Sequence, residues 1–187
     1  MPRIFAAVVP PLEALEHLDD FLEPRRAAGE FRWTRREQFH ITLAFMAQAQ
    51  EHRIEGYVDR LAESLDGLGH GSLRLGGAVV FPNVVEGRVL ATDVLGDAPL
   101  GRLAVRTRNA AVAAGIEVDG QRFRPHLTVA RTGGRPTELT NWVRLLESYD
   151  GPAWPLTEVA VIASYLGEGA RRAPRYETLA VIELAAA

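Results

Sequence analysis

Two amino acids are missing from the 187-residue sequence, which contains no cysteine and no lysine, so that all 21 of its basic residues are arginine. Without cysteine the chain has no disulfide, no thiolate metal site, no cysteine-ligated iron–sulfur cluster and no cysteine nucleophile. Without lysine it has no Schiff base, no pyridoxal phosphate anchor, no Walker A loop and no lysine amine to carry a nucleotide in a ligase. These absences exclude the reactions that need a cysteine or a lysine, but they do not indicate which reaction the protein carries out.

Long hydrophobic runs are also missing. No stretch of about eighteen apolar residues could span a bilayer, and the first twenty residues turn acidic before a secretory cleavage pattern is complete. We therefore expect a cytoplasmic protein that does not act at a membrane. The hydrophobic content of 47% is sufficient for the core of one compact domain or two small lobes. The net charge of −3 argues against bulk, nonspecific nucleic-acid binding.

The arginines are unevenly distributed along the chain. Three groups stand out: Arg25, Arg26, Arg32, Arg35 and Arg36; then Arg102, Arg106, Arg108, Arg122, Arg124, Arg131 and Arg135; and Arg171, Arg172 and Arg175. Such groups are usually solvated surfaces. They would bear on function only if the fold brought them around one cleft.

Apolar spacing predicts alternating helices and strands. Strands are expected at about residues 3–9, 39–46, 72–81, 87–94, 124–131, 156–166 and 176–184, and helices at about 12–23, 53–65, 99–114 and 137–148. The turn-like Pro82-Asn83 between the third and fourth of these strands predicts a hairpin.

A short internal repeat is the most informative pattern. The segment His40-Ile41-Thr42-Leu43-Ala44-Phe45 matches His126-Leu127-Thr128-Val129-Ala130-Arg131, 86 residues further along the chain. A repeat close to half the chain length predicts two similar lobes, each contributing the same strand to a shared groove.

Strand alternation assigns a face to each residue of the repeat. In the first copy it places His40, Thr42 and Ala44 on an open face, opposite the core-facing Ile41 and Leu43. The second copy follows the same rule, so His126, Thr128 and Ala130 should face outward. A histidine and a hydroxyl two residues apart, roughly 6–7 Å, can hold different atoms of one small anion, and the alanine leaves room for it.

Two such strands facing each other suit phosphoester chemistry. One neutral imidazole can remove a proton from water while the other, protonated, donates to the leaving oxygen. The threonine hydroxyls can donate to nonbridging phosphate oxygens, and Arg131 is the first candidate for a guanidinium on the phosphate. Neither motif has a carboxylate or second histidine at ligand spacing, so an acid–base pair without a metal is favoured over a metal site.

With these motifs the sequence resembles the two-histidine phosphoesterases, and within them the LigT-like (ThpR) RNA 2′,3′-cyclic phosphodiesterases, also called 2′-5′ RNA ligases. The resemblance covers nearly the whole chain. It is carried by Arg3-Ile4-Phe5-Ala6, Arg32-Trp33, Glu37 to Phe45, Phe81-Pro82, Arg88-Val89-Leu90, Phe123 to Arg131, Ser164-Tyr165-Leu166, Tyr176 and Leu179.

The resemblance implies a single α+β domain over residues 1–187. Its two pseudo-symmetric antiparallel sheet lobes would enclose a central cleft, with helices outside and one motif, at 40–43 or 126–129, in each lobe. The implied activity is hydrolysis of an RNA-terminal 2′,3′-cyclic phosphate to a 2′-phosphate without metal, ATP or other cofactor, with 2′-5′ RNA joining as the reverse reaction.

The resemblance also implies individual roles. His40 would be the proton donor to the 3′ oxygen and His126 the acceptor that activates water. Thr42, Thr128 and Arg131 would bind phosphate oxygens, and Phe45 would stack on the terminal base. Strict alternation instead puts Phe45 on the core face, so that role needs the strand to end, bend or bulge after Ala44.

Two alternatives remain open from the sequence. The same histidines could act on a small cyclic nucleotide or a cyclic phosphate of ADP-ribose, or the groove could bind an RNA end without turnover. In each case we expect a monomer whose partner is a cyclic phosphate.

Overall fold

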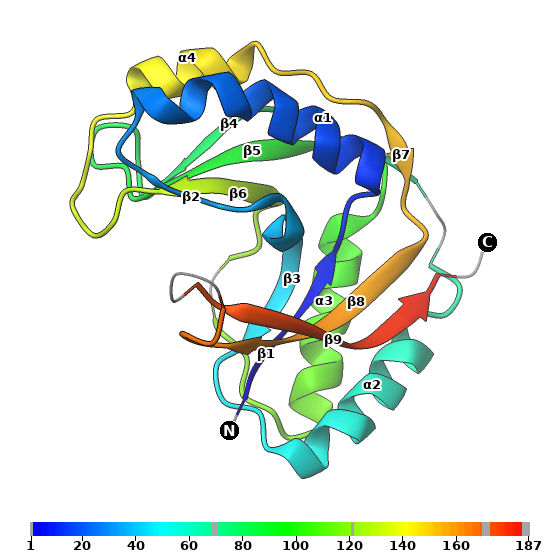
Figure 1. The fold of residues 1–187 in the computed structure, drawn as a ribbon. Helices are drawn as coiled ribbons and strands as arrows, with labels where there is room; N and C mark the ends of the chain where they lie inside the picture. Colours follow the sequence, from blue (N-terminus) through cyan, green and yellow to red (C-terminus); the bar gives the residue numbers. More distant parts are fainter. Residues whose placement is uncertain (1, 69–70, 121, 170–172, 185–187) are drawn as a thin grey trace.

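One strongly curled antiparallel sheet dominates the computed structural model, which describes residues 2–68, 71–120, 122–169 and 173–184 (Figure 1). Its strands are β1 (Arg3–Val8), β2 (Arg32–Trp33), β3 (Ile41–Met46), β4 (Ser72–Phe81), β5 (Val89–Gly96), β6 (His126–Arg131), β7 (Trp154–Pro155), β8 (Glu158–Tyr165) and β9 (Arg175–Glu183). Their order across the sheet is β7-β4-β5-β6-β3-β1-β8-β9, and β2 pairs with β6.

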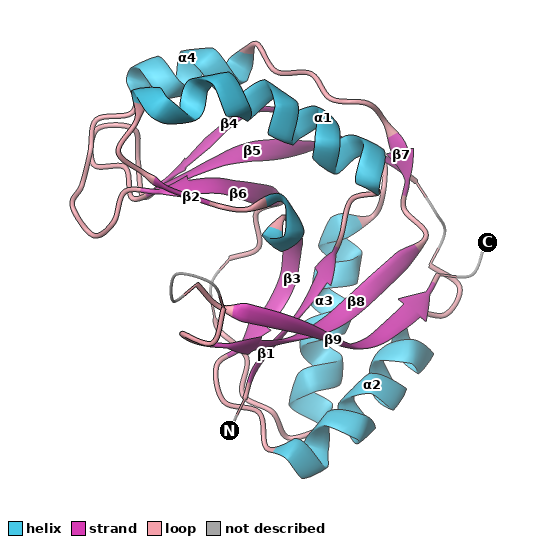
Figure 2. Cartoon of the chain, viewed as in Figure 1, coloured by secondary structure: helices cyan, strands magenta, loops and turns pink. Residues whose placement is uncertain are grey.

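The helices lie on the convex side of this sheet (Figure 2). Helices α1 (Leu12–Leu22) and α4 (Thr140–Glu147) cover β4, β5 and β6, while α2 (Glu51–Leu65) and α3 (Leu100–Ala113) lie outside the half that contains β3, β1, β8 and β9. Two 3₁₀ turns, η1 (Glu23–Ala28) and η2 (Arg36–Gln38), flank β2. The concave side therefore stays open.

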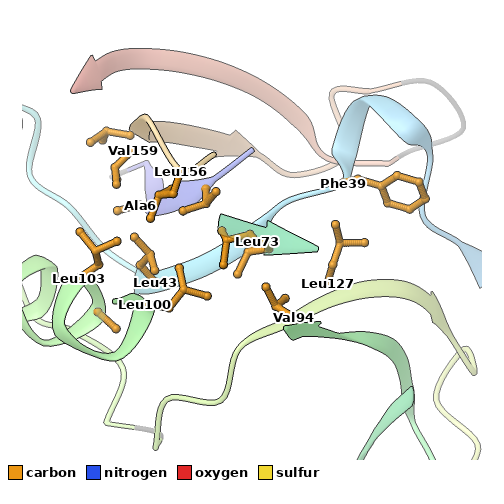
Figure 3. Packing of buried hydrophobic residues seen from close by; sticks show 14 of the residues in the cluster. Ala6, Phe39, Leu43, Leu73, Val94, Leu100, Leu103, Leu127, Leu156 and Val159 are labelled. Carbon is orange, nitrogen blue, oxygen red and sulfur yellow. The ribbon is translucent and has the colours of Figure 1, made fainter. Parts of the chain in front are cut away.

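Burial explains why β1 is an almost continuous apolar run. Ile4, Ala6 and Val8 belong to the main core beneath the helices. Phe5 and Ala7 point the other way, into a second cluster with Ala160 and Ile162 of β8. Figure 3 shows the main core, in which Ala6, Leu43 and Leu127 come from both halves of the sheet and Leu103 comes from α3 (Leu100–Ala113).

The two halves of the sheet meet at β3 and β6. Ile41 of β3 pairs with Leu127 of β6, and both side chains are fully buried. This pair lies in the middle of the two His-x-Thr motifs, so the core contact that joins the halves also brings the motifs together.

Both motif strands contain a bulge at the same position of the repeat. On β3, Thr42 pairs with Ala7 and Ala44 with Ala6, so Leu43 is an extra residue without a partner on β1. On β6, Thr128 pairs with Ala91 and Ala130 with Leu90, so Val129 is extra relative to β5. A bulge shifts side-chain alternation by one residue, so every later side chain changes face.

The predicted fold class is confirmed, with antiparallel sheet and outer helices around a concave side. The two predicted sheets are halves of one continuous sheet, joined at β3 and β6. The predicted hairpin forms between β4 and β5, and the longer helices and strands lie within a few residues of expectation. No helix in the described ranges is both long and apolar enough to cross a membrane.

Candidate active site

A cleft of about 810 Å³ occupies the concave side of the sheet. All six residues that the sequence analysis selected line it: His40, Thr42, Phe45, His126, Thr128 and Arg131. Residues 86 positions apart in the chain thus share one site.

The direction of the strands determines how the two motifs face each other. Because β3 and β6 are antiparallel around Ile41 and Leu127, His40 lies toward Thr128, and Thr42 lies toward His126. The result is a four-cornered arrangement in which each imidazole has the other motif's hydroxyl beside it.

Each imidazole is oriented by the same backbone contact. Nδ1 of His40 is 2.7 Å from the carbonyl oxygen of Gln38, and Nδ1 of His126 is 2.8 Å from that of Arg124. Since a carbonyl can only accept, Nδ1 carries a hydrogen in both rings and donates it. When the rings are neutral, Nε2 is therefore the unprotonated nitrogen, the one able to take up a proton.

Aromatic rings pack against both imidazoles. Phe5 of β1 stacks on His40 with the ring centroids 4.6 Å apart, and Tyr176 of β9 meets the same ring edge-on at 5.6 Å. Phe81 of β4 contacts His126 edge-on at 4.8 Å. These contacts restrict the rotation of both rings and exclude water from one side of each.

Burial lowers the pKa of both histidines. The pKa of His40 falls to about 4, mainly because its ring is desolvated, with smaller contributions from the charges of His126 and Arg131. The pKa of His126 is lowered for the same main reason, and Arg131 and Arg124 lower it further, whereas Asp93 raises it. In the free protein at neutral pH both rings are neutral.

The bulges decide which residue follows each motif into the cleft. After Leu43 the alternation is shifted, so Phe45 lines the cleft instead of the core; after Val129 the same shift brings Arg131 into it. The bulge lies at Leu43, just before Ala44, whereas strand alternation predicted that a stacking role of Phe45 needs the strand to end, bend or bulge after Ala44. The expectation that Ala44 and Ala130 face the ligand is wrong, because the shift buries both.

The arginine groups contribute unequally to the cleft. Arg26, Arg32 and Arg35 of the first group line it, but Arg131 is the sole member of the second group among its described lining residues. Arg102, Arg106 and Arg108 lie on α3, on the convex side. Of the third group, Arg175 pairs with Glu168 and Glu177, and residues 171 and 172 lie outside the described residues.

Several cleft residues were given no role from the sequence: Phe5, Phe31, Trp33, Gln38 and Tyr176. Gln38 links the site to the segment before β9, because its Nε2 donates to the carbonyl oxygen of Pro174 at 2.7 Å. Phe5 lies in a strand whose residues are almost all apolar, so the sequence predicts only that its side chain is buried. Apolar spacing therefore could not distinguish a cleft residue from a core residue at this position.

Comparison with known proteins identifies similar families and folds. Residues 8–91 match the family model described as LigT like Phosphoesterase. An RNA 2′,3′-cyclic phosphodiesterase of Bacillus subtilis is 32% identical over 100 residues, which make up 54% of this chain and 55% of that protein. A Geobacillus stearothermophilus protein of the same name is 26% identical over 183 residues, covering 96% of this chain and 56% of its own length. The matches thus span little more than half of these two relatives.

Solved structures share the fold over the full length. A Thermus thermophilus protein has a TM-score of 0.78 at 24% identity and covers 97% of both chains. The Escherichia coli LigT structure with 3′-AMP also has a TM-score of 0.78, at 23% identity, with 98% of this chain and 99% of that chain covered.

The buried imidazole of His40 should make stability depend on pH. Between pH 6.5 and about 4 the unfolded chain binds a proton at His40 that the folded protein does not, so the free energy of unfolding falls as the pH is lowered through this range. Urea unfolding measures the free energy of unfolding at pH 7 and at pH 5. The decrease between these two pH values should be smaller by about 1–2 kcal/mol in His40→Ala than in the parent.

His52→Ala provides the matched control, because it removes an exposed histidine in the first turn of α2. It should retain the parent's pH dependence. An equal loss of stability in the parent and in His40→Ala would show that the folded protein protonates His40 as readily as the unfolded chain does.

Proposed function

Because residues 8–91 match the LigT like Phosphoesterase model and the relatives carry the name RNA 2′,3′-cyclic phosphodiesterase, we propose that the protein hydrolyses a 2′,3′-cyclic phosphate at an RNA 3′ end to a 2′-phosphate. The observation that carries the proposal is the pairing of His40 and His126 in one cleft, each held through Nδ1 with a threonine of the other motif beside it. The names of the relatives and the 3′-AMP bound by Escherichia coli LigT support this substrate class.

The reaction needs one proton removed and one supplied. Nε2 of His126 takes a proton from water as the water oxygen attacks phosphorus. The bond from phosphorus to the 3′ oxygen breaks, and Nε2–H of His40 protonates that oxygen. The product carries a 3′ hydroxyl and a 2′-phosphate. The assignment of donor and acceptor follows the family resemblance, since the two rings have the same local geometry.

The lowered pKa values describe the free protein. A bound phosphate anion beside the rings favours a protonated imidazole, so substrate binding raises the pKa of the histidine that must act as the acid. Burial then ensures that the second ring stays neutral and able to act as the base. The site therefore acquires one proton with its substrate.

The remaining groups bind the phosphate and the nucleoside. The hydroxyls of Thr42 and Thr128 and the guanidinium of Arg131 can donate to the nonbridging oxygens, whose charge must be stabilised in the transition state. Phe45, in the cleft and packed beside the Phe5 cluster, offers a ring face to the terminal base. If a 5′ hydroxyl of a second strand attacks phosphorus in place of water, the same proton transfers to His126 and from His40 join the ends 2′-5′ and leave a free 3′ hydroxyl.

Removal of either histidine should disable the reaction. An oligoribonucleotide ending in a 2′,3′-cyclic phosphate, incubated in EDTA without ATP, should yield a 2′-phosphate, and His40→Ala and His126→Ala should each lower kcat by about 10²–10⁴. The double variant should be little slower than the slower single variant, because the two groups act as a unit. Phosphate position is identified by chromatography against authentic standards.

His52→Ala should match the parent in this assay, since His52 lies on α2 on the convex side. Binding of the cyclic phosphate by the parent without turnover would favour the RNA-end binding module instead. Turnover that survives in both cleft variants would exclude this site.

A sulfur-substituted substrate separates the donor from the acceptor. When the bridging 3′ oxygen is replaced by sulfur, the leaving atom needs no proton, so loss of the general acid should cost little. We expect the rate deficit of His40→Ala relative to the parent to be at least about tenfold smaller on this substrate than on the oxygen substrate. His126→Ala should remain as slow as before. Rescue of His126→Ala instead would exchange the two roles.

A further inference from the structure

We propose that Arg32 binds a second phosphate of the substrate, the one attached to the 5′ oxygen of the terminal nucleotide. The site would then recognise the end of an RNA strand and not an isolated cyclic nucleoside phosphate. The proposal rests on the proposed function and adds which part of the RNA is recognised beyond the reacting phosphate.

The register of the sheet places two arginines side by side. Arg32 of β2 is the cross-strand partner of Arg131 of β6, and both side chains line the cleft. Directly opposed residues have Cβ atoms about 4.5–5.5 Å apart, and like charges in this position destabilise the pair. In the described part of the chain neither arginine forms an ion pair with a carboxylate.

The rest of the cleft does not compensate this charge. Its charged lining residues other than histidine are Arg26, Arg32, Arg35 and Arg131, and none of the described lining residues is a carboxylate. Arg26 differs from the pair, because it is neutralised by Asp19 and by Glu23 at 2.7 Å. Two adjacent guanidiniums without an acidic partner are a binding site for anionic oxygens.

Arg131, and not Arg32, is among the charges that act on the two imidazoles. The charge of Arg131 lowers the pKa of both His40 and His126, which places its guanidinium near the imidazoles. Arg32 lies on the neighbouring strand β2, directly opposite Arg131 and roughly 5 Å from it across the sheet. A phosphate at Arg131 is the cyclic phosphate, so a phosphate at Arg32 is the neighbouring one along the strand.

Aromatic side chains continue the cleft beyond Arg32. Trp33 and Phe31 line it, and they pack edge-to-face with each other and with Trp142 of α4 at centroid distances of 5.1–5.5 Å. A rigid aromatic wall beside an arginine is the arrangement that accommodates single-stranded nucleic acid. This wall distinguishes a nucleotide strand from a small inorganic anion.

Calorimetry with product-like ligands tests the proposal without relying on turnover. The probes are adenosine 2′-phosphate, adenosine 2′,5′-bisphosphate, and the adenosine dinucleotide that ends in a 2′-phosphate. The additional phosphate should lower the Kd of the parent about 10- to 100-fold, the range expected of a charge-assisted hydrogen bond. In Arg32→Gln this preference should fall below about threefold.

Arg102→Gln is the matched control, because it makes the same charge change at an exposed position of α3 on the convex side. It should retain the full preference of the parent. Equal affinities for adenosine 2′-phosphate and the bisphosphate in the parent, or a preference that persists in Arg32→Gln, would overturn the proposal. A preference for the dinucleotide alone would also overturn it, since recognition would then lie in the second nucleoside.

Failure of the proposed function has a separate signature. A parent protein that shows the bisphosphate preference but does not hydrolyse a terminal cyclic phosphate retains the Arg32 site and loses only the catalytic assignment. A parent protein that hydrolyses the terminal cyclic phosphate but shows no preference for the bisphosphate retains the catalytic assignment and loses the Arg32 site.

Discussion

The buried pair of Ile41 and Leu127 joins the two halves of the sheet, and the cleft depends on it. Each residue is the central position of a His-x-Thr motif, so the hydrophobic contact on the convex side determines the spacing of the polar groups on the concave side. Because the strands are antiparallel, the contact also sets the diagonal order of the imidazoles and hydroxyls. Stability and site geometry therefore share one interaction, and a substitution that loosened the joint would separate the motifs.

The two His-x-Thr motifs have the same local structure on either side of the contact between Ile41 and Leu127. Each histidine donates through Nδ1 to the carbonyl two residues earlier, each packs against a phenylalanine from another strand of the sheet, and each strand bulges three residues after its histidine. The copies differ at the residue that follows the bulge into the cleft, which is Phe45 in one and Arg131 in the other. One half therefore offers an apolar ring and the other a guanidinium, as a nucleoside phosphate would require.

Periodicity located the strands because a buried sheet imposes a period of two on apolar side chains, and the repeat identified the two motifs. The bulges at Leu43 and Val129 were not predictable from the period, since a bulge becomes visible only when the partner strand is known. For this reason Ala44 and Ala130 were placed in the cleft wrongly. The two-residue strand β2 carries too few residues for any period, so the position of Arg32 beside Arg131 emerged only from the sheet register.

The charge of the cleft also could not be predicted by counting arginines along the sequence. The group with the larger excess of arginine has three members on α3, on the convex side, and only Arg131 among the described lining residues of the cleft. Three members of the shorter group near Arg32 line the cleft, because β2 pairs with the edge of β6. The low pKa values of the histidines likewise come from burial by Phe5, Tyr176 and Phe81, which reach the site from three other strands. Tertiary packing thus lowers the pKa of two ordinary histidines, so that both rings are neutral in the free protein at neutral pH.

The central claim is that both imidazoles act through Nε2 on one phosphate, and nitrogen NMR of the histidine rings tests it most directly. In the free protein at pH 7, His40 and His126 should both show a protonated Nδ1 and an unprotonated Nε2. Addition of adenosine 2′-phosphate should shift the Nε2 resonances of both rings together. A ring with its hydrogen on Nε2 in the free protein, or a phosphate that perturbs only one of the two, would contradict the account.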